Sequence, residues 1–310
     1  MPGIGLISNP YSRKNRKRPE RLKKLVELSP DKELVKLPVS YEDMDNALLL
    51  FKKRNVDVLA VNGGDGTVHV MLSRLIKIYG DKELPKIAIL KGGTMNQTAT
   101  NLRIKGDSKA ILKRVIKAYR NIKKRALKVK KVSLLSVNDK CGFIFGSGSI
   151  CTFMDIYHKS GDPSPFVAGK AVLKLVNSII VKGPIYKKVF APVSQKITVD
   201  GFCFGETPYL ATLISTIPEV GLRFELMTRA KDDHTKAHLI AFHEGAKIIP
   251  QIPRAWLGLS LPPDLADDTV GRKFVLESEK PFKYTLDGDF YTCSGSLVVK
   301  TGPVLDIVVE

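Results

Sequence analysis

The sequence predicts two domains: an α/β N-terminal domain with a doubly wound, mostly parallel sheet, and a mostly antiparallel β-sandwich C-terminal domain. The chain has 310 residues, which suggests two domains at a prior of ~150 residues each. Short apolar runs alternate with helical patterns between residues 4 and 122, as in a parallel sheet covered by helices. From about residue 126 the runs are β-rich and separated by turn residues. We therefore expect domains at 1–125 and 126–310.

Apolar spacing and end signals define the elements of the first domain. Ser40 is a candidate helix N-cap because Asp43 follows it by three residues. The predicted strands are Ile4–Ser8, Glu33–Leu37, Val56–Val61 and Lys86–Leu90. The predicted helices are Pro19–Leu28, the segment from Ser40 to about Arg54, and Val68–Tyr79. Strand and helix alternate, which favours helices on both faces of the sheet.

The second domain contains β-rich runs separated by Gly, Pro and Asn-Asp turns, which are typical of antiparallel strands. Two or three helices are expected to interrupt these strands, near Ser149–His158, Val167–Val181 and Thr235–Glu244. The segment Phe282–Glu310 is predicted to form strands around the turn Asp287-Gly288-Asp289.

The charge of the chain is its most unusual bulk property. Lys and Arg total 50 against 31 Asp and Glu, so the formal net charge is +19. Such a field attracts polyanions: nucleic acid, phosphorylated small molecules or an anionic membrane. Acidic residues are absent from 108–138 and from 163–199. These stretches are either solvated helix faces or a surface for anionic lipid.

Several features bear on the cellular location. Four cysteines without a C-x-x-C pair predict reduced thiols in a cytosolic protein. We find no signal-peptide pattern and no apolar run that approaches the ~18 residues of a membrane span. Weak signals for a membrane interface occur in Val167–Val181 and in the loop around Trp256. We expect a cytoplasmic protein, soluble or peripheral at the inner membrane face.

The strongest functional signal is the loop Gly63-Gly64-Asp65-Gly66-Thr67, which follows a buried strand and precedes a helix. Glycine permits positive φ and lets a phosphate approach backbone N–H groups. The helix behind the loop directs its positive end at the anion. Asp65 is not expected to contact phosphate, because both are anionic. We expect it to bind Mg²⁺ or to orient the loop through backbone N–H groups.

A second glycine loop, Lys91-Gly92-Gly93-Thr94-Met95-Asn96, follows the next strand. Thr94 and Asn96 can hydrogen-bond phosphate, ribose or adenine. Loops at the carboxyl ends of neighbouring parallel strands converge on one crevice. Asn9 follows the first strand and Ser40 the second. Four strand ends could therefore serve one ligand, although a helix cap explains Ser40 equally well.

The chain lacks a P-loop and a dinucleotide fingerprint. It carries N-P-x-S at its start, G-G-D-G-T near residue 65, G-T-x-N about thirty residues later and D-G-D near its end. In this order the motifs resemble those of the diacylglycerol kinase catalytic-domain superfamily, specifically soluble bacterial lipid kinases and sphingosine-kinase-like enzymes. The resemblance implies an ATP-binding α/β domain and a lipid-binding β-sandwich. It also implies a nucleotide site in the cleft between them, towards which the last strands could pack back.

The resemblance also implies roles for particular residues. Asp287-Gly288-Asp289 matches the family's D-G-E, which holds the catalytic acidic residue. The nucleotide-binding residues that match are Lys14, Ser40, Gly63 to Thr67, Thr94 and Asn96. The departures from the family pattern are Arg13 for Gly, Met95 for Gly, Gln97 for Asp and Asp289 for Glu. Asp232 and Asp233 are candidates for an acidic metal cluster that is hard to place.

The expected function is transfer of a phosphoryl group from ATP, with Mg²⁺, to a lipid alcohol such as diacylglycerol, a sphingoid base or ceramide. Asp287 or Asp289 would take the hydroxyl proton, and the sequence does not divide the role between them. Rival hypotheses are an NAD kinase-like or phosphofructokinase-like enzyme, and a non-catalytic module that binds nucleic acid or membrane. The basic segments lack interleaved aromatic residues, which disfavours nucleic acid as a partner. The sequence leaves open whether the protein forms a homodimer.

Overall fold

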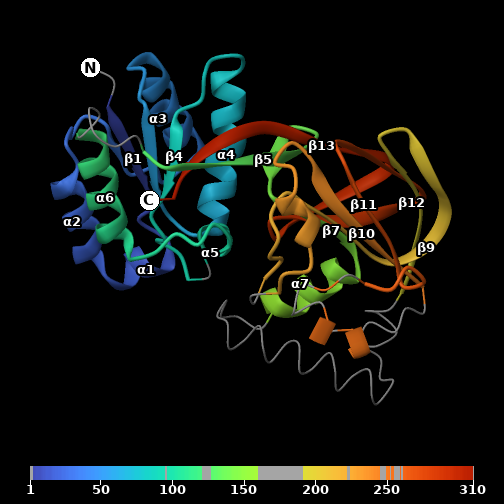
Figure 1. The fold of residues 1–310 in the computed structure, drawn as a ribbon. Helices are drawn as coiled ribbons and strands as arrows, with labels where there is room; N and C mark the ends of the chain where they lie inside the picture. Colours follow the sequence, from blue (N-terminus) through green and yellow to red (C-terminus); the bar gives the residue numbers. More distant parts are fainter. Residues whose placement is uncertain are drawn as a thin grey trace. The chain divides into compact units, whose positions relative to one another are not determined.

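The computed structural model describes residues 3–94, 96–120, 127–159, 191–221, 224–244, 249–251, 253–254, 259 and 261–309. The chain forms two compact units, Met1–Val132 with Pro303–Glu310, and Ser133–Gly302 (Figure 1). The predicted combination of an α/β unit and an antiparallel, strand-rich unit is confirmed at this level. The final segment of the chain falls in the first unit, whereas the sequence placed all of 126–310 in the second.

The strands at the start of the first unit pair in parallel. β1 (Ile4–Ser8) lies between β2 (Val35–Lys36) and β3 (Val58–Asn62). On its other side β3 pairs with β4 (Lys86–Ile89). Every residue of β1 and β3 is buried, which explains why these segments read as continuous apolar runs rather than alternating ones. Their carboxyl ends lie at the same edge of the sheet.

Local capping chemistry sets the ends of the longer helices. α2 (Pro19–Leu28) has proline in its first turn, and α3 (Tyr41–Lys53) follows the cap residue Ser40. α4 (Asp65–Tyr79) ends at Gly80, whose φ of +56° suits glycine. The shorter or later helices of the unit are α1 (Arg13–Lys17), α5 (Gln97–Asn101) and α6 (Ser108–Arg120). α2 packs on α6, and α3 packs on α4 (Figure 1).

The first unit is completed by the end of the chain. Ile307 of β13 (Asp289–Val308) pairs in parallel with Ile87 of β4. Val309 N also donates a hydrogen bond to Lys128 O at 3.0 Å. The unit is therefore built from two stretches of sequence that are separated by the whole of the second unit.

The second unit is an antiparallel arrangement with β9 (Phe202–Ser215) and β12 (Lys273–Leu286) at its centre. β9 pairs antiparallel with β7, β8 and β10, and β12 pairs antiparallel with β7, β8 and β13. The other strands are β5 (Val129–Val137), β6 (Lys140–Gly142), β7 (Ile144–Gly148), β8 (Val193–Val199), β10 (Ala237–His243) and β11 (Ala266–Gly271). Short 3-10 helices are formed by Thr228–Lys231 and Ile249–Gln251.

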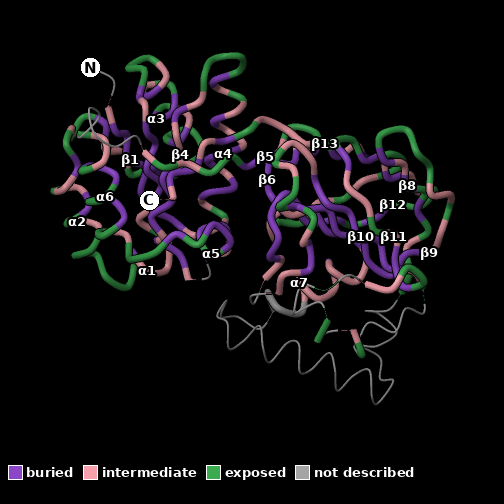
Figure 2. The backbone as a smooth tube through the Cα atoms, in the orientation of Figure 1, coloured by how far each residue is buried: buried purple, intermediate pink, exposed green. Residues whose placement is uncertain are grey.

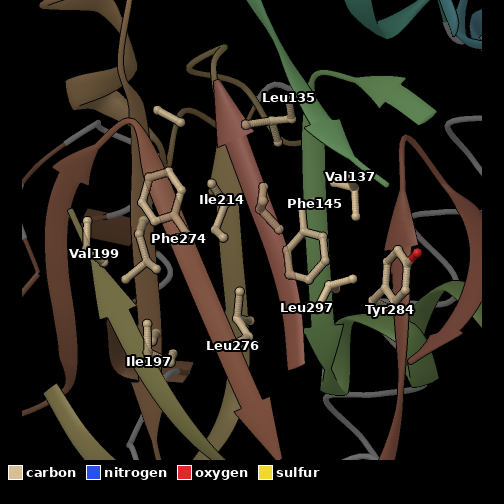
Figure 3. Packing of buried hydrophobic residues seen from close by; sticks show 14 of the residues in the cluster. Leu135, Val137, Phe145, Ile197, Val199, Ile214, Phe274, Leu276, Tyr284 and Leu297 are labelled. Carbon is tan, nitrogen blue, oxygen red and sulfur yellow. The ribbon is translucent and has the colours of Figure 1, made fainter. Parts of the chain in front are cut away.

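The second half of β9 and nearly all of β10 are buried on both faces, and the second unit has two apolar clusters. On β10, Leu239 and Ala241 belong to the larger cluster, whereas Ile240 and Phe242 belong to the smaller one. Successive side chains of a strand alternate between the two faces of the sheet, so these residues fall into the two clusters in turn. The tube of β10 is mostly buried (Figure 2). Figure 3 shows the larger cluster, with side chains from β5, β7, β8, β9, β12 and β13 packed together.

The prediction of a helix near Thr235–Glu244 is wrong. Ala237–His243 forms β10, which pairs with β9 on one side and β11 on the other. The segment is apolar at nearly every position, and such a run does not distinguish a buried strand from a buried helix by its periodicity. Burial on both faces of the sheet decides for the strand.

The prediction near Ser149–His158 is confirmed by α7 (Ser149–Lys159). The predicted helix Val167–Val181 and Trp256 lie outside the described residues. No helix in the described part of the chain is both long and apolar enough to span a bilayer.

The large cluster predicts a matched pair of stability effects. Phe274 is fully buried in it, whereas Phe202 at the start of β9 is 66% exposed. Phe274→Ala should lower the free energy of unfolding by about 3–5 kcal/mol, because it leaves a cavity. Phe202→Ala should cost about 1 kcal/mol or less. Urea denaturation of both variants checks this, and equal losses would contradict the burial pattern.

Candidate functional site

The loops that follow β1, β3 and β4 are joined by hydrogen bonds at the carboxyl edge of the first unit's sheet. Asn9 Nδ2 donates to Thr67 Oγ1 at 2.9 Å, and Asn9 N donates to Asn62 O at 3.0 Å. Ser12 Oγ donates to Gly92 O at 3.2 Å. The first loop of the chain thus contacts both glycine loops, and the three form one surface of backbone and small polar side chains.

The two glycine loops touch backbone to backbone. A Cβ on Gly93 would overlap Gly64 Cα, and a Cβ on Gly92 would lie 2.6 Å from Asn62 Oδ1. A Cβ on Gly63 would overlap the side chain of Thr67. Only glycine fits at these positions. The expectation that the first loop needs glycine for positive φ is wrong, because none of its glycines has a positive φ; what it needs is space.

A buried polar network supports the edge from beneath. Asn62 Nδ2 donates to Ser8 Oγ at 2.7 Å and to Asn15 Oδ1 at 3.1 Å. Asn15 Nδ2 donates to Asn9 O at 2.7 Å. Ser8, Asn15 and Asn62 are all at least 96% buried. The sequence analysis overlooked this network, although asparagines placed just after two apolar strands are the signal that could have revealed it.

Asp65 holds the loops together at the start of α4. Its Oδ1 accepts a hydrogen bond from Thr98 N at 3.2 Å, which links the first glycine loop to α5. This contact is the loop-orienting role that was one of the two expectations for Asp65. No group of three or more His, Cys, Asp or Glu side chains gathers around a possible metal position within the described ranges. Asp233, a candidate for the metal cluster, instead accepts hydrogen bonds from Thr235.

Asn96 shapes the second loop from within. Its Oδ1 accepts from Gly93 N at 3.0 Å and its Nδ2 donates to Gly93 O at 2.8 Å. Its φ of +49° places it in the left-handed region, which asparagine tolerates. Both side-chain atoms therefore close the loop on itself. Thr94 is partly exposed beside it, and Met95 lies outside the described residues.

Cations surround the second loop. Lys14 Nζ donates to Lys91 O at 3.5 Å, Lys91 Nζ donates to Ile104 O, and Arg114 donates to Lys105 O. Burial lowers the pKa of Lys14, and the nearby charge of Arg21 lowers it further. Burial also lowers the pKa of Lys91, with Lys14 and Arg114 adding to the effect. These cations repel one another, so an anion bound near them would be favoured.

Ser40 caps the N-terminus of α3. Its Oγ accepts from Asp43 N at 3.0 Å, and Asp43 Oδ2 accepts from Ser40 N at 3.1 Å, which forms a capping box. The backbone N–H groups of Val39 and Ser40 and the Ser40 hydroxyl hold the pKa of Asp43 below its ordinary value. Within the described part of the chain, no hydrogen bond links Ser40 to the other three strand-end loops.

In the second unit, Asp287-Gly288 is the two-residue turn of the β12–β13 hairpin. Leu286 pairs with Asp289 across it, and the turn residues have φ of +51° and +96°. The carboxylate of Asp287 accepts hydrogen bonds from Phe143 N and Ile144 N, both at 2.9 Å. Asp289, at the start of β13, is exposed. Asp287 therefore has a structural role, because it anchors the turn to the backbone of Phe143 and Ile144.

The first unit also resembles a known catalytic domain in sequence. Residues 4–129 match the family model of the diacylglycerol kinase catalytic domain. The resemblance to that superfamily, predicted from the motifs, is confirmed. The match supports a kinase, a phosphotransferase with an ATP-type co-substrate. Among curated proteins, none matches the sequence significantly.

Solved structures share the fold over nearly the whole chain. A proposed diacylglycerol kinase from Bacillus anthracis str. Sterne has a TM-score of 0.74 at 16% identity, with 99% of this chain and 97% of that chain covered. A diacylglycerol kinase from the same strain gives 0.67 at 16% identity, with coverage of 99% and 97%. Yeast NADH kinase in complex with NADH gives 0.50 at 10% identity, with coverage of 100% and 84%. These likenesses show the two-unit kinase fold.

The contact between the glycine loops predicts opposite effects of two alanine substitutions. Gly93→Ala should lower the melting temperature and weaken ATP binding, because the added Cβ forces the loops apart at about 1–3 kcal/mol. At Gly66, which lies within α4, an added Cβ would have no heavy atom within 4 Å. Gly66→Ala should therefore leave the melting temperature unchanged or raise it. Thermal melts and ATP titrations measure both. Equal melting temperatures would contradict the close approach.

The capping box predicts how Ser40 tolerates change. Ser40→Ala should lower the free energy of unfolding by about 0.5–2 kcal/mol, whereas Ser40→Asp keeps a capping oxygen and should stay near the wild type. If Ser40 also lies against a nucleotide phosphate, the new carboxylate of Ser40→Asp should weaken ATP binding without loss of stability. Denaturation and ATP titration of the two variants separate the roles. A free energy of unfolding for Ser40→Asp that is as low as that of Ser40→Ala would contradict the capping role.

Proposed function

We propose that this protein is an ATP-dependent lipid kinase that transfers the γ-phosphoryl group of ATP to a hydroxyl of a membrane lipid. The acceptor class is diacylglycerol, a sphingoid base, ceramide or a similar lipid alcohol. One observation carries the proposal: the segment that matches the catalytic domain contains two glycine loops packed backbone to backbone. In this proposal the first unit is a doubly wound nucleotide-binding domain, and the second is a lipid-binding sandwich.

In the proposed complex, the nucleotide phosphates lie against Gly63 to Thr67 at the start of α4. The backbone N–H groups of a helix start and the positive end of its dipole favour an anion there. Asn9 fixes the hydroxyl of Thr67 through its amide. Lys14 supplies positive charge, and its lowered pKa reflects a partly buried ammonium group ready to gain an anionic partner. Thr94 contributes a partly exposed hydroxyl from the second loop.

Asp65 is the residue that would lie closest to a Mg²⁺ ion carried by the nucleotide. The fit is partial, because Asp65 already accepts the Thr98 amide and the described residues add no carboxylate cluster. Most oxygen ligands would have to come from phosphate and water, as is usual for nucleotide-bound Mg²⁺. When bound, the ion would neutralise phosphate charge. The chain's own contribution at this point is to hold the loop.

The transfer itself needs a proton acceptor. The bond between the γ-phosphorus and the bridging oxygen breaks to leave ADP, a bond to the lipid hydroxyl oxygen forms, and the hydroxyl proton passes to a carboxylate. We assign that carboxylate to the turn Asp287-Gly288-Asp289. Two backbone amides fix the carboxylate of Asp287 in place. Asp289 is exposed, so its carboxylate is accessible to a substrate.

The choice of a lipid acceptor rests on the family match and on the solved structures described as diacylglycerol kinases. A kinase that phosphorylates a nicotinamide dinucleotide is the second candidate, because the yeast NADH kinase shares the fold. Incubation of the full chain with labelled ATP and a total lipid extract should label a phospholipid. Labelling of NAD or NADH instead, with no labelled lipid, would overturn the lipid assignment.

Substitutions in the turn test the proton acceptor. Asp289→Asn should reduce lipid phosphorylation at least about a hundredfold with an unchanged melting temperature. Asp287→Asn should reduce activity and also lower the melting temperature, because a carboxylate that accepts two backbone N–H groups is lost. Activity assays and thermal melts of both variants are needed. Full activity in both would sink the assignment.

A further inference from the structure

Much of the chain's excess charge lies in the α2–α6 helix pair and in the segments that lead into these two helices. Residues 13–28 hold eight Lys or Arg and two Glu, and residues 103–120 hold seven Lys or Arg and one Asp. The two helices lie side by side (Figure 1). α6 buries Ile111, Leu112, Val115 and Ile116, so its lysines and arginines project from the opposite side. A net charge of +12 is thus concentrated on two segments that fold together.

Two hollows run along the line where these helices meet. One of about 350 Å³ is lined by Leu28, Lys113, Ile116, Lys117 and Arg120. The other, of about 150 Å³, is lined by Arg21, Lys24, Leu25, Asp107, Ser108 and Lys109. Each hollow combines an apolar floor with exposed cations at its rim, and the smaller one also has the exposed carboxylate of Asp107. This combination suits an anionic head group attached to a hydrocarbon body.

Within the described ranges, the cations of the larger hollow have no carboxylate as an ion-pair partner. Among the described residues, none of Lys113, Lys117 and Arg120 forms an ion pair with a carboxylate. Basic residues that form no internal ion pairs repel one another. The binding of an external anion therefore lowers their electrostatic free energy. Each Lys or Arg near an anionic bilayer contributes about 1 kcal/mol.

The chemistry of this face favours lipid over nucleic acid. Surfaces that bind single strands stack bases on exposed aromatic rings. Tyr119 is the single aromatic residue in α2 and α6, and its hydroxyl donates to Asp57 Oδ2 at 2.6 Å. The hollows offer aliphatic floors instead, formed by Leu25, Leu28 and Ile116.

We infer that the α2–α6 face is the surface by which this protein docks on an anionic lipid bilayer. The choice of a bilayer rests on the proposed lipid substrate, but the surface itself is defined by its charge and shape. Docking through the first unit would keep the ATP-binding loops close to the membrane that contains the acceptor. Lys113, Lys117 and Arg120 lie outside the residues assigned to the proposed nucleotide site, so they can be altered without changing that site.

A charge-neutralising triple variant, Lys113→Gln/Lys117→Gln/Arg120→Gln, tests the inference. The full chain should co-float with phosphatidylcholine vesicles that contain phosphatidylglycerol, but not with pure phosphatidylcholine, and about 0.5 M salt should release it. The triple variant should bind the anionic vesicles at least about tenfold more weakly. Its ATP affinity should be unchanged, which separates failure of docking from failure of the proposed kinase function.

The matched control is Lys53→Gln/Lys77→Gln/Lys280→Gln, which removes the same charge from exposed positions on α3, α4 and β12. It should retain vesicle binding within about twofold. Equal weakening by both triple variants would overturn the assignment to this face in favour of overall charge. Oligonucleotide binding that the α6 triple variant loses, with vesicle binding unaffected, would assign the face to nucleic acid instead.

Discussion

The contact between Gly64 and Gly93 constrains the whole functional edge of the first unit. Two main chains approach so closely that a Cβ on Gly93 would overlap Gly64 Cα, and a Cβ on Gly64 would lie 3.3 Å from Gly93 Cα. This contact brings the loops after β3 and β4 together. The start of α4 is held by this contact, and so is the position of Asp65 against α5. The hydrogen bonds of Asn9 and Ser12 then attach the loop after β1 to the two glycine loops. The polar side chains at this edge act on the backbone of neighbouring loops and hold it in place.

The sequence predicted the elements of the first unit well because each has a local signature. Ile4–Ser8 and Pro19–Leu28 have the expected bounds, and Ser40 caps its helix. The prediction failed at Thr235–Glu244, where alanine and leucine favour a helix and only the flanking strands decide for β10. The strands that flank β10 come from distant parts of the chain. The spacing of apolar residues within a segment does not indicate which strands will flank it.

The sequence predicted which loops meet more accurately than it predicted the contacts of their residues. Polar and glycine-rich segments after apolar strands were enough to bring the loops after β1, β3 and β4 to one edge of the sheet. The sequence did not reveal that Asn96 closes its own loop, that Asp65 meets the Thr98 amide, or that Asn15 and Asn62 lie buried beneath. Each of these is a hydrogen bond chosen by tertiary proximity. An amide side chain looks the same in sequence whether it binds a ligand or a neighbouring backbone.

The return of β13 to the first unit has a consequence for how the protein is made. On the ribosome the chain emerges from its N-terminus, so β4 is formed long before Pro303–Glu310 leaves the exit tunnel. Until then the open side of β4 is an unpaired sheet edge, a template for mispairing with other chains. The second unit can mature in that interval. The first unit therefore begins to fold before the second, but it is completed only after Pro303–Glu310 has been made.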